Sequence, residues 1–153
     1  MLTQNALDIL KDDHDTIKNL FRQYEATQSE AYETKQWIAQ HVFRELDLHS
    51  QLEEQIFYPA VRSATTDKGH ELVLEGMEEH HVIDVLIEEL RDSHPTDERY
   101  DAKFKVLGEN VEHHIQEEEE ELFLIAEQEL GDRLDQLGDE MWRRKEVLML
   151  APQ

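Results

Sequence analysis

Six polar residues are spaced along the sequence in a way that suits metal binding. Two histidine–carboxylate pairs share the spacing His-x-x-x-Glu, and a further histidine precedes each pair. The six residues are His14, His49, Glu53, His80, His114 and Glu118. Residues four apart on a helix project from the same face, so the imidazole and the carboxylate of one pair can reach the same cation or two adjacent cations. The spacing therefore predicts a metal site built from nitrogen and oxygen ligands.

The two halves of the chain carry this pattern twice. When His14 is aligned with His80, apolar residues follow each histidine at the same offsets of three, six and seven residues. The second histidine comes 35 residues later in one half (14 to 49) and 34 residues later in the other (80 to 114), and large apolar residues follow it at offsets of eight and nine. Such a separation brings the two histidines of an antiparallel helix pair to one level. The repeat predicts two facing halves related by a pseudo-two-fold axis.

Position on the helix separates the two pairs from chance matches, because His-x-x-x-Glu occurs three more times in this glutamate-rich chain. At about 100° per residue, Glu53 lies about 40° from His49, within the apolar stripe of its helix. His114 and Glu118 share the apolar stripe of a later helix in the same way. We expect the remaining histidines to lie at the surface or at its boundary: His41, His70, His81, His94 and His113.

Buried carboxylates and imidazoles need compensation from hydrogen bonds, cations or a metal. One such histidine alone is more often a hydrogen-bonded core residue, but six polar residues in two equal registers favour a metal. Ligands without sulfur fit iron, manganese or zinc, and two bridging carboxylates with four histidines suit two metal ions. We predict two iron ions, with structural zinc as the alternative. Asp84 and Glu121 are weaker candidates, either as extra ligands or as acceptors for an imidazole N–H.

Four long amphipathic helices are expected to position these ligands. Helical periodicity runs through residues 3–28, 31–63, 67–92 and 97–128, and short polar or Gly- and Pro-bearing stretches separate the blocks. The second block has the apolar stripe Ile38, Val42, Leu46, Ile56 and Ala60. The fourth has the stripe Phe104, Leu107, Val111, Leu122 and Ile125.

The final segment, residues 130–150, is expected to fold back as shorter helical material that closes one end or one flank. The sequence thus predicts an all-α fold, an antiparallel up-down-up-down four-helix bundle with a short C-terminal helical extension. We expect one domain over residues 1–153, with the bundle in about residues 3–128.

Composition excludes several classes of function. With 37 acidic and 15 basic residues the net charge is −22, so nucleic acid and anionic membrane surfaces would be repelled. The absence of cysteine excludes disulfides and thiolate metal sites. No run approaches 18 apolar residues, and the first residues lack a basic start and an apolar stretch, so we expect a cytoplasmic protein.

Four segments of the chain together resemble the helices of hemerythrin-like (HHE) cation-binding domains: DDHDTIKNLF, HSQLEEQIFYP, EEHHVIDVLIEEL and HHIQEEEEELF. The resemblance covers about residues 5–127. It implies a left-handed antiparallel four-helix bundle around a non-haem, oxo- or hydroxo-bridged di-iron centre. It also implies that the four histidines are terminal ligands and that Glu53 and Glu118 are bridges.

The third helix departs from the pattern of the invertebrate oxygen carriers, which offer two histidines four residues apart there. Here Gly76 lies four residues before His80, and Asp84 lies four after it. This difference favours redox turnover, peroxide chemistry or sensing over reversible oxygen carriage. Three hypotheses follow: a module that binds or senses dioxygen, a di-iron peroxidase or catalase-like enzyme, and an iron-handling or adaptor protein. We expect dioxygen or peroxide as the small ligand, and the sequence does not identify a reductant or protein partner.

Overall fold

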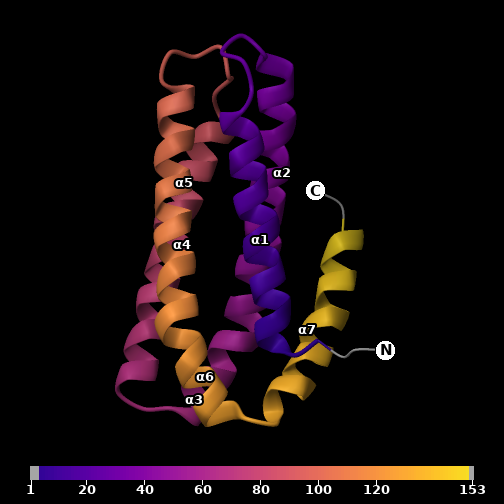
Figure 1. Cartoon of the computed structure of the whole chain (residues 1–153), viewed down its shortest axis with the longest axis vertical. Coiled ribbons are helices and arrows are strands. Elements are labelled where there is room, and N and C mark those ends of the chain that lie inside the picture. Colours follow the sequence, from indigo (N-terminus) through magenta and orange to yellow (C-terminus); the bar gives the residue numbers. More distant parts are fainter. Residues whose placement is uncertain (1–3, 152–153) are drawn as a thin grey trace.

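The computed structural model describes residues 4–151, and these residues form helices and turns, with no strand among them. Figure 1 shows long helices side by side along the long axis of the molecule. The single helices are α1 (Ala6–Glu25), α4 (Lys68–Arg91) and α7 (Arg133–Leu150). Two longer rods are composite: α2 (Tyr32–Leu52), η1 (Glu53–Phe57) and α3 (Tyr58–Ala64), then α5 (Tyr100–Glu117), η2 (Glu118–Leu122) and α6 (Phe123–Leu130). The all-α prediction is confirmed, and the helix bounds agree with the predicted blocks within a few residues.

Local sequence sets where the helices begin and turn. At the start of α1 the Asn5 side chain accepts a hydrogen bond from the Asp8 N–H at 2.9 Å, and the Asp8 carboxylate accepts one from the Asn5 N–H at 3.1 Å. This capping box satisfies two amide groups that the first helical turn leaves unpaired. Between α6 and α7 the chain turns at Gly131, whose φ of 49° is a left-handed conformation that favours glycine.

Both composite rods contain one wider, π-helical turn. In η1 the Tyr58 N–H donates to the Glu53 carbonyl, and in η2 the Phe123 N–H donates to the Glu118 carbonyl, so each bond spans five residues. Each wide turn begins at the glutamate of a His-x-x-x-Glu pair. The repeat in the sequence is therefore also a repeat of this backbone irregularity.

The wide turns change which residues face the core beyond each glutamate. After Glu53, Phe57 and Val61 are fully buried, whereas the predicted stripe residues Ile56 and Ala60 are only partly buried. After Glu118, Ala126 is fully buried in place of the predicted Ile125. The predicted Leu122 is buried and thus confirmed, but the predicted Ile56, Ala60 and Ile125 each lie one residue before a buried position, because a π-helical turn adds one residue to the helical repeat.

The His/Glu residues form a polar layer between two apolar clusters. Along α1, His14 lies between Leu10, which belongs to one cluster, and Ile17, which belongs to the other. Along α4, His80 lies in the same way between Val73 and Ile83. The apolar clusters on both sides hold the helices together, and the polar layer lies where they exclude water.

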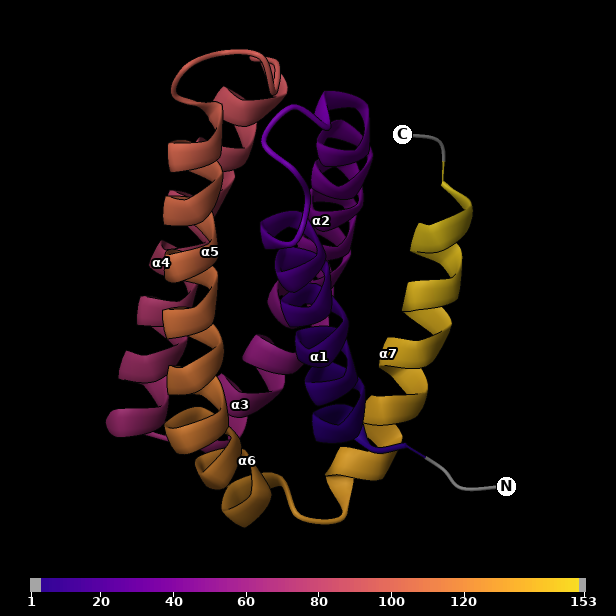
Figure 2. The same cartoon turned by 45° about the horizontal axis from the view of Figure 1, so that its top comes forward.

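Helix α7 packs on the flank of α1 and α2, as Figures 1 and 2 both show. Its Lys145 ammonium pairs with the Asp13 carboxylate of α1 at 2.8 Å, and the Arg144 guanidinium donates to the Gln55 side chain of η1 at 2.8 Å. The C-terminal segment therefore covers one flank, which is one of the two positions predicted for it.

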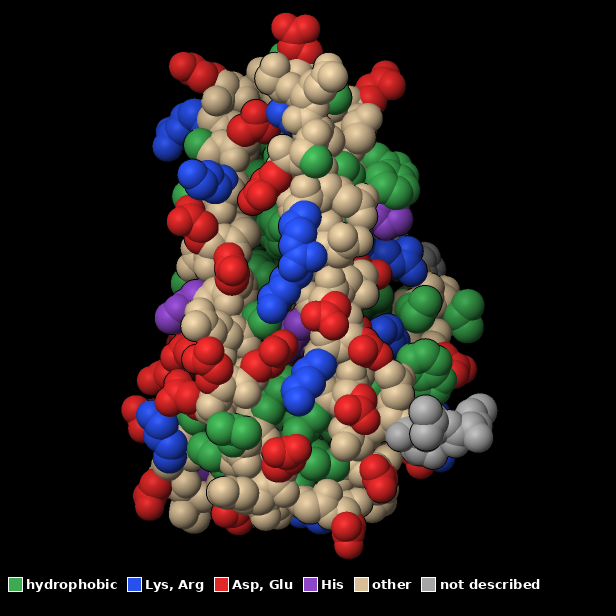
Figure 3. Space-filling model, viewed as in Figure 1, with side chains coloured by type: hydrophobic (Ala, Val, Ile, Leu, Met, Phe, Trp, Pro, Cys, Tyr) green, Lys and Arg blue, Asp and Glu red, His purple; other side chains and the backbone are tan. Residues whose placement is uncertain are grey.

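Acidic side chains are scattered over the face shown in Figure 3, with fewer lysines and arginines between them. This distribution agrees with the net charge of −22. Within residues 4–151, no helix is both long enough and apolar enough to cross a membrane.

Candidate metal centre

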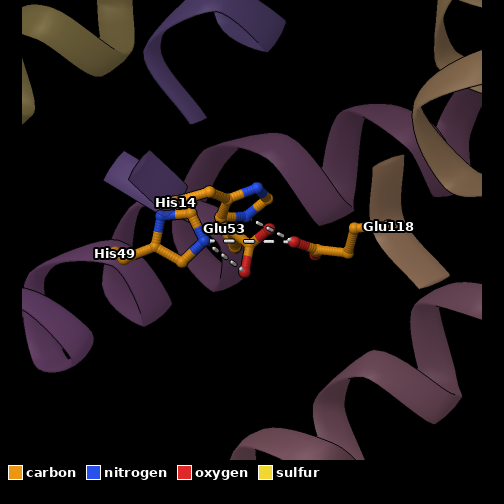
Figure 4. Close-up of side chains that lie close together, drawn as sticks. All are labelled: His14, His49, Glu53 and Glu118. Atoms are coloured by element: carbon orange, nitrogen blue, oxygen red, sulfur yellow. Dashed lines mark hydrogen bonds and ion pairs between the residues drawn. The ribbon is translucent and has the colours of Figure 1, made fainter. Parts of the chain in front are cut away.

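All six predicted ligand residues come together in one buried layer. The histidines come from α1, α2, α4 and α5, and each of the two glutamates is the first residue of a wide turn. None of the six is more than 3% exposed. Figure 4 shows four of them, with the rings of His14 and His49 beside the carboxylates of Glu53 and Glu118. The fold thus brings together residues that lie up to 104 positions apart in the sequence.

The Nε2 atoms of the histidines point toward the carboxylates. In one group, His14 Nε2 lies 3.2 Å from Glu118 Oε1, and His49 Nε2 lies 3.3 Å from Glu53 Oε1. In the other, His80 Nε2 lies 3.0 Å from Glu53 Oε1, and His114 Nε2 lies 3.4 Å from Glu118 Oε2. Glu53 contacts histidines of both groups through one oxygen, whereas Glu118 contacts one group with each oxygen. Both carboxylates are therefore shared between two histidine pairs.

Two buried polar atoms in this layer lack a hydrogen-bond partner, namely His49 Nε2 and Glu53 Oε2. In addition, the Nε2 atoms of His80 and His114 face each other at 3.2 Å. Buried polar atoms without partners are unfavourable, and cations compensate lone pairs that converge in this way. The donor set therefore fits metal ions, and its shared carboxylates fit two of them.

A carboxylate also contacts the Nδ1 atom of each histidine. The four Nδ1–oxygen pairs are His14 with Glu119 (2.6 Å), His49 with Asp13 (3.0 Å), His80 with Glu54 (2.8 Å) and His114 with Glu79 (2.6 Å). When Nδ1–H donates to a carboxylate, the ring orientation is fixed and the Nε2 lone pair stays free for a metal. These contacts thus orient the four imidazole rings for metal binding through Nε2.

These outer carboxylates follow the sequence repeat, and sequence reasoning missed them. Asp13 and Glu79 directly precede the first histidine of each half, and Glu54 and Glu119 directly follow the two ligand glutamates. A search for acidic residues next to each ligand in both copies would have found all four. On a regular helix a residue directly before or after a ligand lies about 100° away from it, so helical periodicity does not point to these carboxylates.

The two weaker candidates lie outside this layer. The Glu121 side chain is 46% exposed and lies 4.0 Å from the Lys68 ammonium. Asp84 is exposed, and burial of part of its carboxyl together with the nearby Asp47 raises its pKa. The other five histidines, His41, His70, His81, His94 and His113, lie at the surface or its boundary.

Comparison with known proteins agrees with the geometry. The family model of the hemerythrin HHE cation binding domain matches residues 5–126. The chain belongs to the hemerythrin HHE cation-binding family. A crystal structure of an HHE cation-binding domain-containing protein from Mycobacterium kansasii superposes with a TM-score of 0.81 at 26% identity, over 95% of this chain and 87% of that one.

The curated relatives of this HHE domain differ in length. An uncharacterised protein of Mycobacterium tuberculosis is 29% identical over 153 residues, which is 97% of this chain and 89% of that protein. A DNA nickase of Nostoc sp. is 24% identical over 127 residues, and the match covers 83% of this chain. The match spans only about a third of the nickase, 35% of its length.

Electrostatics in the HHE layer favour charged groups in the absence of metal. Burial opposes protonation of His49, but the charge of Glu53 and the hydrogen bond to Asp13 raise its pKa well above the usual range. Burial likewise opposes protonation of His80, yet hydrogen bonds to Glu53 and Glu54 raise its pKa to about 9. Burial and the charge of Glu118 disfavour ionisation of Glu53, but the charge of His49 lowers its pKa to about 2. Protons thus hold the positions that metal ions would take.

Tyr58 is a further residue of the layer that sequence reasoning missed. Its side chain is 1% exposed, and its hydroxyl donates to Glu118 Oε2 at 2.7 Å. A regular helix would place Tyr58 about 180° from His49, and the extra residue of η1 reduces that angle to about 80°. The sequence signal is the large apolar residue nine positions after the second histidine in both halves, on a face that a regular helix would turn away from the core.

The two sides of the layer differ in charge at their outer edges. Asp13 is paired with Lys145 of α7, whereas its counterpart Glu79 lies in a partly exposed group with His113 and Glu117 whose possible ligand atoms lie within 4.8 Å of one another. A hydrogen bond with Glu79 raises the pKa of Glu117 to about 7. One edge of the layer is therefore covered by a cation, and the other is acidic and open.

Proposed function

We propose that this HHE domain holds two iron ions and binds or senses dioxygen, or a related small ligand, at that pair. The observation that carries the proposal is that Glu53 and Glu118 are each shared between two histidine pairs, and that His49 Nε2 and Glu53 Oε2 are buried without a hydrogen-bond partner. Two hard carboxylates and four imidazoles without sulfur are ligands that suit iron.

The protein residues have distinct roles in this proposal. His14 and His49 would hold one ion, His80 and His114 the other, and Glu53 and Glu118 would bridge them. The outer carboxylates accept from the Nδ1–H groups and aim each Nε2 inward, and the two apolar clusters exclude water from the layer. A bound iron pair supplies reversible redox chemistry toward small oxygen-containing ligands.

The proposal extends to the arrangement and location of the chain. We infer that α1, the rod from α2 to α3, α4, and the rod from α5 to α6 alternate in direction as an antiparallel four-helix bundle. The acidic surface and the buried site are compatible with a cytoplasmic protein served by a separate reductant or partner. Stopped-flow reduction of the oxidised protein by candidate cytoplasmic redox partners tests that part.

Metal analysis of protein purified with iron tests the central claim. We expect two irons per chain, and loss of iron in a His49→Ala/His114→Ala double variant, since each pair loses one terminal ligand. A matched His41→Ala/His94→Ala double variant, which removes two exposed histidines, should retain both irons. Zinc in place of iron, or full iron retention in the first variant, would contradict the proposal.

Peroxide turnover is the second candidate function, and the third helix favours it. The position four residues before His80 is Gly76, and the Tyr58 hydroxyl lies against that glycine, so a proton donor lies beside the His80 and His114 pair. Mixing the reduced protein with oxygen separates the two functions. A stable, reversible spectral change supports binding or sensing, whereas rapid autoxidation with oxygen evolution from added peroxide supports turnover.

A further inference from the structure

Lys145 connects the C-terminal helix α7 to the metal layer. Its ammonium lies 2.8 Å from Asp13 Oδ1, and Asp13 Oδ2 accepts a hydrogen bond from His49 Nδ1 at 3.0 Å. On the far side of the same ring, His49 Nε2 is buried and lacks a hydrogen-bond partner. A row of three side chains therefore runs from α7 to a ligand atom of the layer.

This row is largely shielded from water. The Lys145 side chain is 19% exposed and the Asp13 side chain 5%, whereas the two ends of the surface ion pair between Arg91 and Asp47 are 42% and 39% exposed. Solvent and salt screen a buried pair less than an exposed one. The charge of Lys145 therefore acts on Asp13 more strongly than the charge of an ordinary surface lysine would.

Close packing of α7 against the start of α1 directs Lys145 toward Asp13. Gly138 is buried, and a Cβ atom there would lie 2.9 Å from the Asn5 Cα, so the glycine lets the two backbones approach. Met141 follows three residues later and is fully buried, and Lys145 lies four residues beyond it on the same face of the helix. Figures 1 and 2 both show α7 beside α1.

The other half of the repeat lacks such a cation. The counterpart of Asp13 is Glu79, which lies 2.6 Å from His114 Nδ1 and 3.7 Å from His113 Nε2. Among residues 4–151, no lysine or arginine forms an ion pair with Glu79, and a second carboxyl group, that of Glu117, lies beside it. The two ion positions therefore differ in the charge behind one histidine of each.

A cation behind a ligand histidine favours the lower oxidation state of an iron ion. Lys145 draws electron density from Asp13, so Asp13 takes less of the Nδ1 proton and the His49 ring is a weaker donor through Nε2. The positive charge itself acts in the same direction. At an effective dielectric constant of about 20, a unit charge about 10 Å from an ion shifts a one-electron equilibrium roughly tenfold.

We propose that Lys145 is a positioning residue that acts through Asp13 and His49, and that it makes the ion position on α1 and α2 the first of the two to be reduced. This inference rests on the proposed di-iron function. One electron from an external reductant converts ferric to ferrous iron at that position, and no bond in the row of side chains breaks. The C-terminal helix thus helps to set the redox properties of the layer without supplying a ligand.

Redox titration of the iron-loaded protein tests the assignment. Protein with two irons per chain is oxidised with ferricyanide, desalted and titrated with dithionite and mediators, while optical and electron paramagnetic resonance spectra follow the two one-electron steps. Lys145→Met removes the charge and keeps an unbranched side chain. We expect the first step to move to lower potential by about 59 mV, which is a tenfold change for one electron, and the second step to move less.

Arg143→Gln is the matched control, because Arg143 is exposed on the same helix and its replacement changes the net charge by the same amount. This variant should keep the wild-type potentials. Lys145→Arg keeps a cation and should leave the first step near its wild-type potential. Circular dichroism establishes that the variants fold, and Lys145→Gln takes the place of Lys145→Met if that variant does not.

The outcomes distinguish this inference from the proposed function. Unchanged potentials in the Lys145 variant, a larger shift of the second step, or an equal shift in Arg143→Gln would each overturn the inference. The two irons would still be bound in these cases, so the di-iron proposal would stand. Wild-type protein that binds no iron would overturn the proposed function, and this inference with it.

Discussion

At the scale of single residues, the outer carboxylates distinguish this layer from a set of buried histidines. Each imidazole has one nitrogen on a carboxylate and the other toward the centre. A neutral imidazole can donate from only one nitrogen, so the carboxylate determines which nitrogen is left to bind metal. Ligand strength therefore depends on residues that do not touch the metal themselves.

Glu79→Gln is expected to weaken metal binding by about 10- to 100-fold, because loss of such a carboxylate partner frees the His114 ring and lowers its basicity. Competition with a chelator of known affinity measures the effect. Glu78→Gln is the matched control, since Glu78 is the exposed neighbour on the same helix and should leave affinity unchanged. Equal affinities of the two variants would show that Glu79 does not support His114.

The metal-free protein is expected to be most stable in mildly acidic solution. In the folded state the pKa of His80 is raised from 6.5 to about 9, so its stabilisation is complete below pH 6.5 and is lost as pH rises toward 9. The pKa of Glu53 is lowered from 4.5 to about 2, so its contribution is present above pH 4.5 and is lost as pH falls toward 2. Thermal melts of chelator-treated protein should therefore peak between about pH 4.5 and 6.5.

The metal-loaded protein provides the control for this pH dependence. Metal binding displaces the protons on the histidines, so affinity should rise with pH over the range in which the metal-free protein loses stability. If the melting temperature of the metal-free protein rose steadily between pH 6.5 and 9, the proton-stabilised layer would be ruled out.

At the scale of helical elements, the sequence predicted register correctly up to each ligand glutamate and, apart from Leu122, one residue too early beyond it. Val42 and Leu46 are buried as predicted. One turn past Glu53, however, the buried residue is Phe57 and not the predicted Ile56. Periodicity of 3.6 residues cannot anticipate a wide turn, because such a turn adds one residue to the helical repeat. The helices and the six clustered residues were predictable from the repeat, whereas Tyr58 required the structure.

Deletion of Gln55 is expected to preserve the fold, because it removes one exposed residue from the wide turn η1 and leaves a regular helix. Phe57 and Val61 then keep their present core-facing directions, at about −20° and 20° from His49. Deletion of Gln40, exposed in the regular part of α2, instead rotates one side of the helix by about 100° relative to the other.

Circular dichroism and thermal melts compare the two deletions. The Gln55 deletion should lower stability by about 1–2 kcal/mol, through the lost contact with Arg144 and small shifts in packing. The Gln40 deletion should lower it by more than about 4 kcal/mol, because it turns core residues toward solvent. Equal losses would show that the wide turn is not a removable insertion.

At the scale of the whole molecule, charge sets which partners the surface accepts. The chain has a net charge of −22. One of its relatives is a DNA nickase, but the match covers only about a third of that protein. Binding to nucleic acid draws most of its affinity from cations placed on phosphates, and here 37 acidic residues outnumber 15 basic ones. We therefore expect no binding of labelled duplex DNA in anisotropy titrations at low salt, with a basic protein as positive control. Salt-sensitive binding of DNA by this chain would contradict that expectation.

Metal is expected to stabilise the whole bundle, because its ligands come from four helical rods that unfolding would separate. A ligand that binds only the folded chain at 100 times its dissociation constant adds about 2.7 kcal/mol to the free energy of unfolding. For a chain of this length that corresponds to a rise of about 5–10 °C in melting temperature. Calorimetry before and after chelation measures the difference, and the His49→Ala/His114→Ala double variant should show no metal-dependent rise. An equal rise in that variant would mean that the stabilising metal binds elsewhere, for example at the acidic group of Glu79, His113 and Glu117.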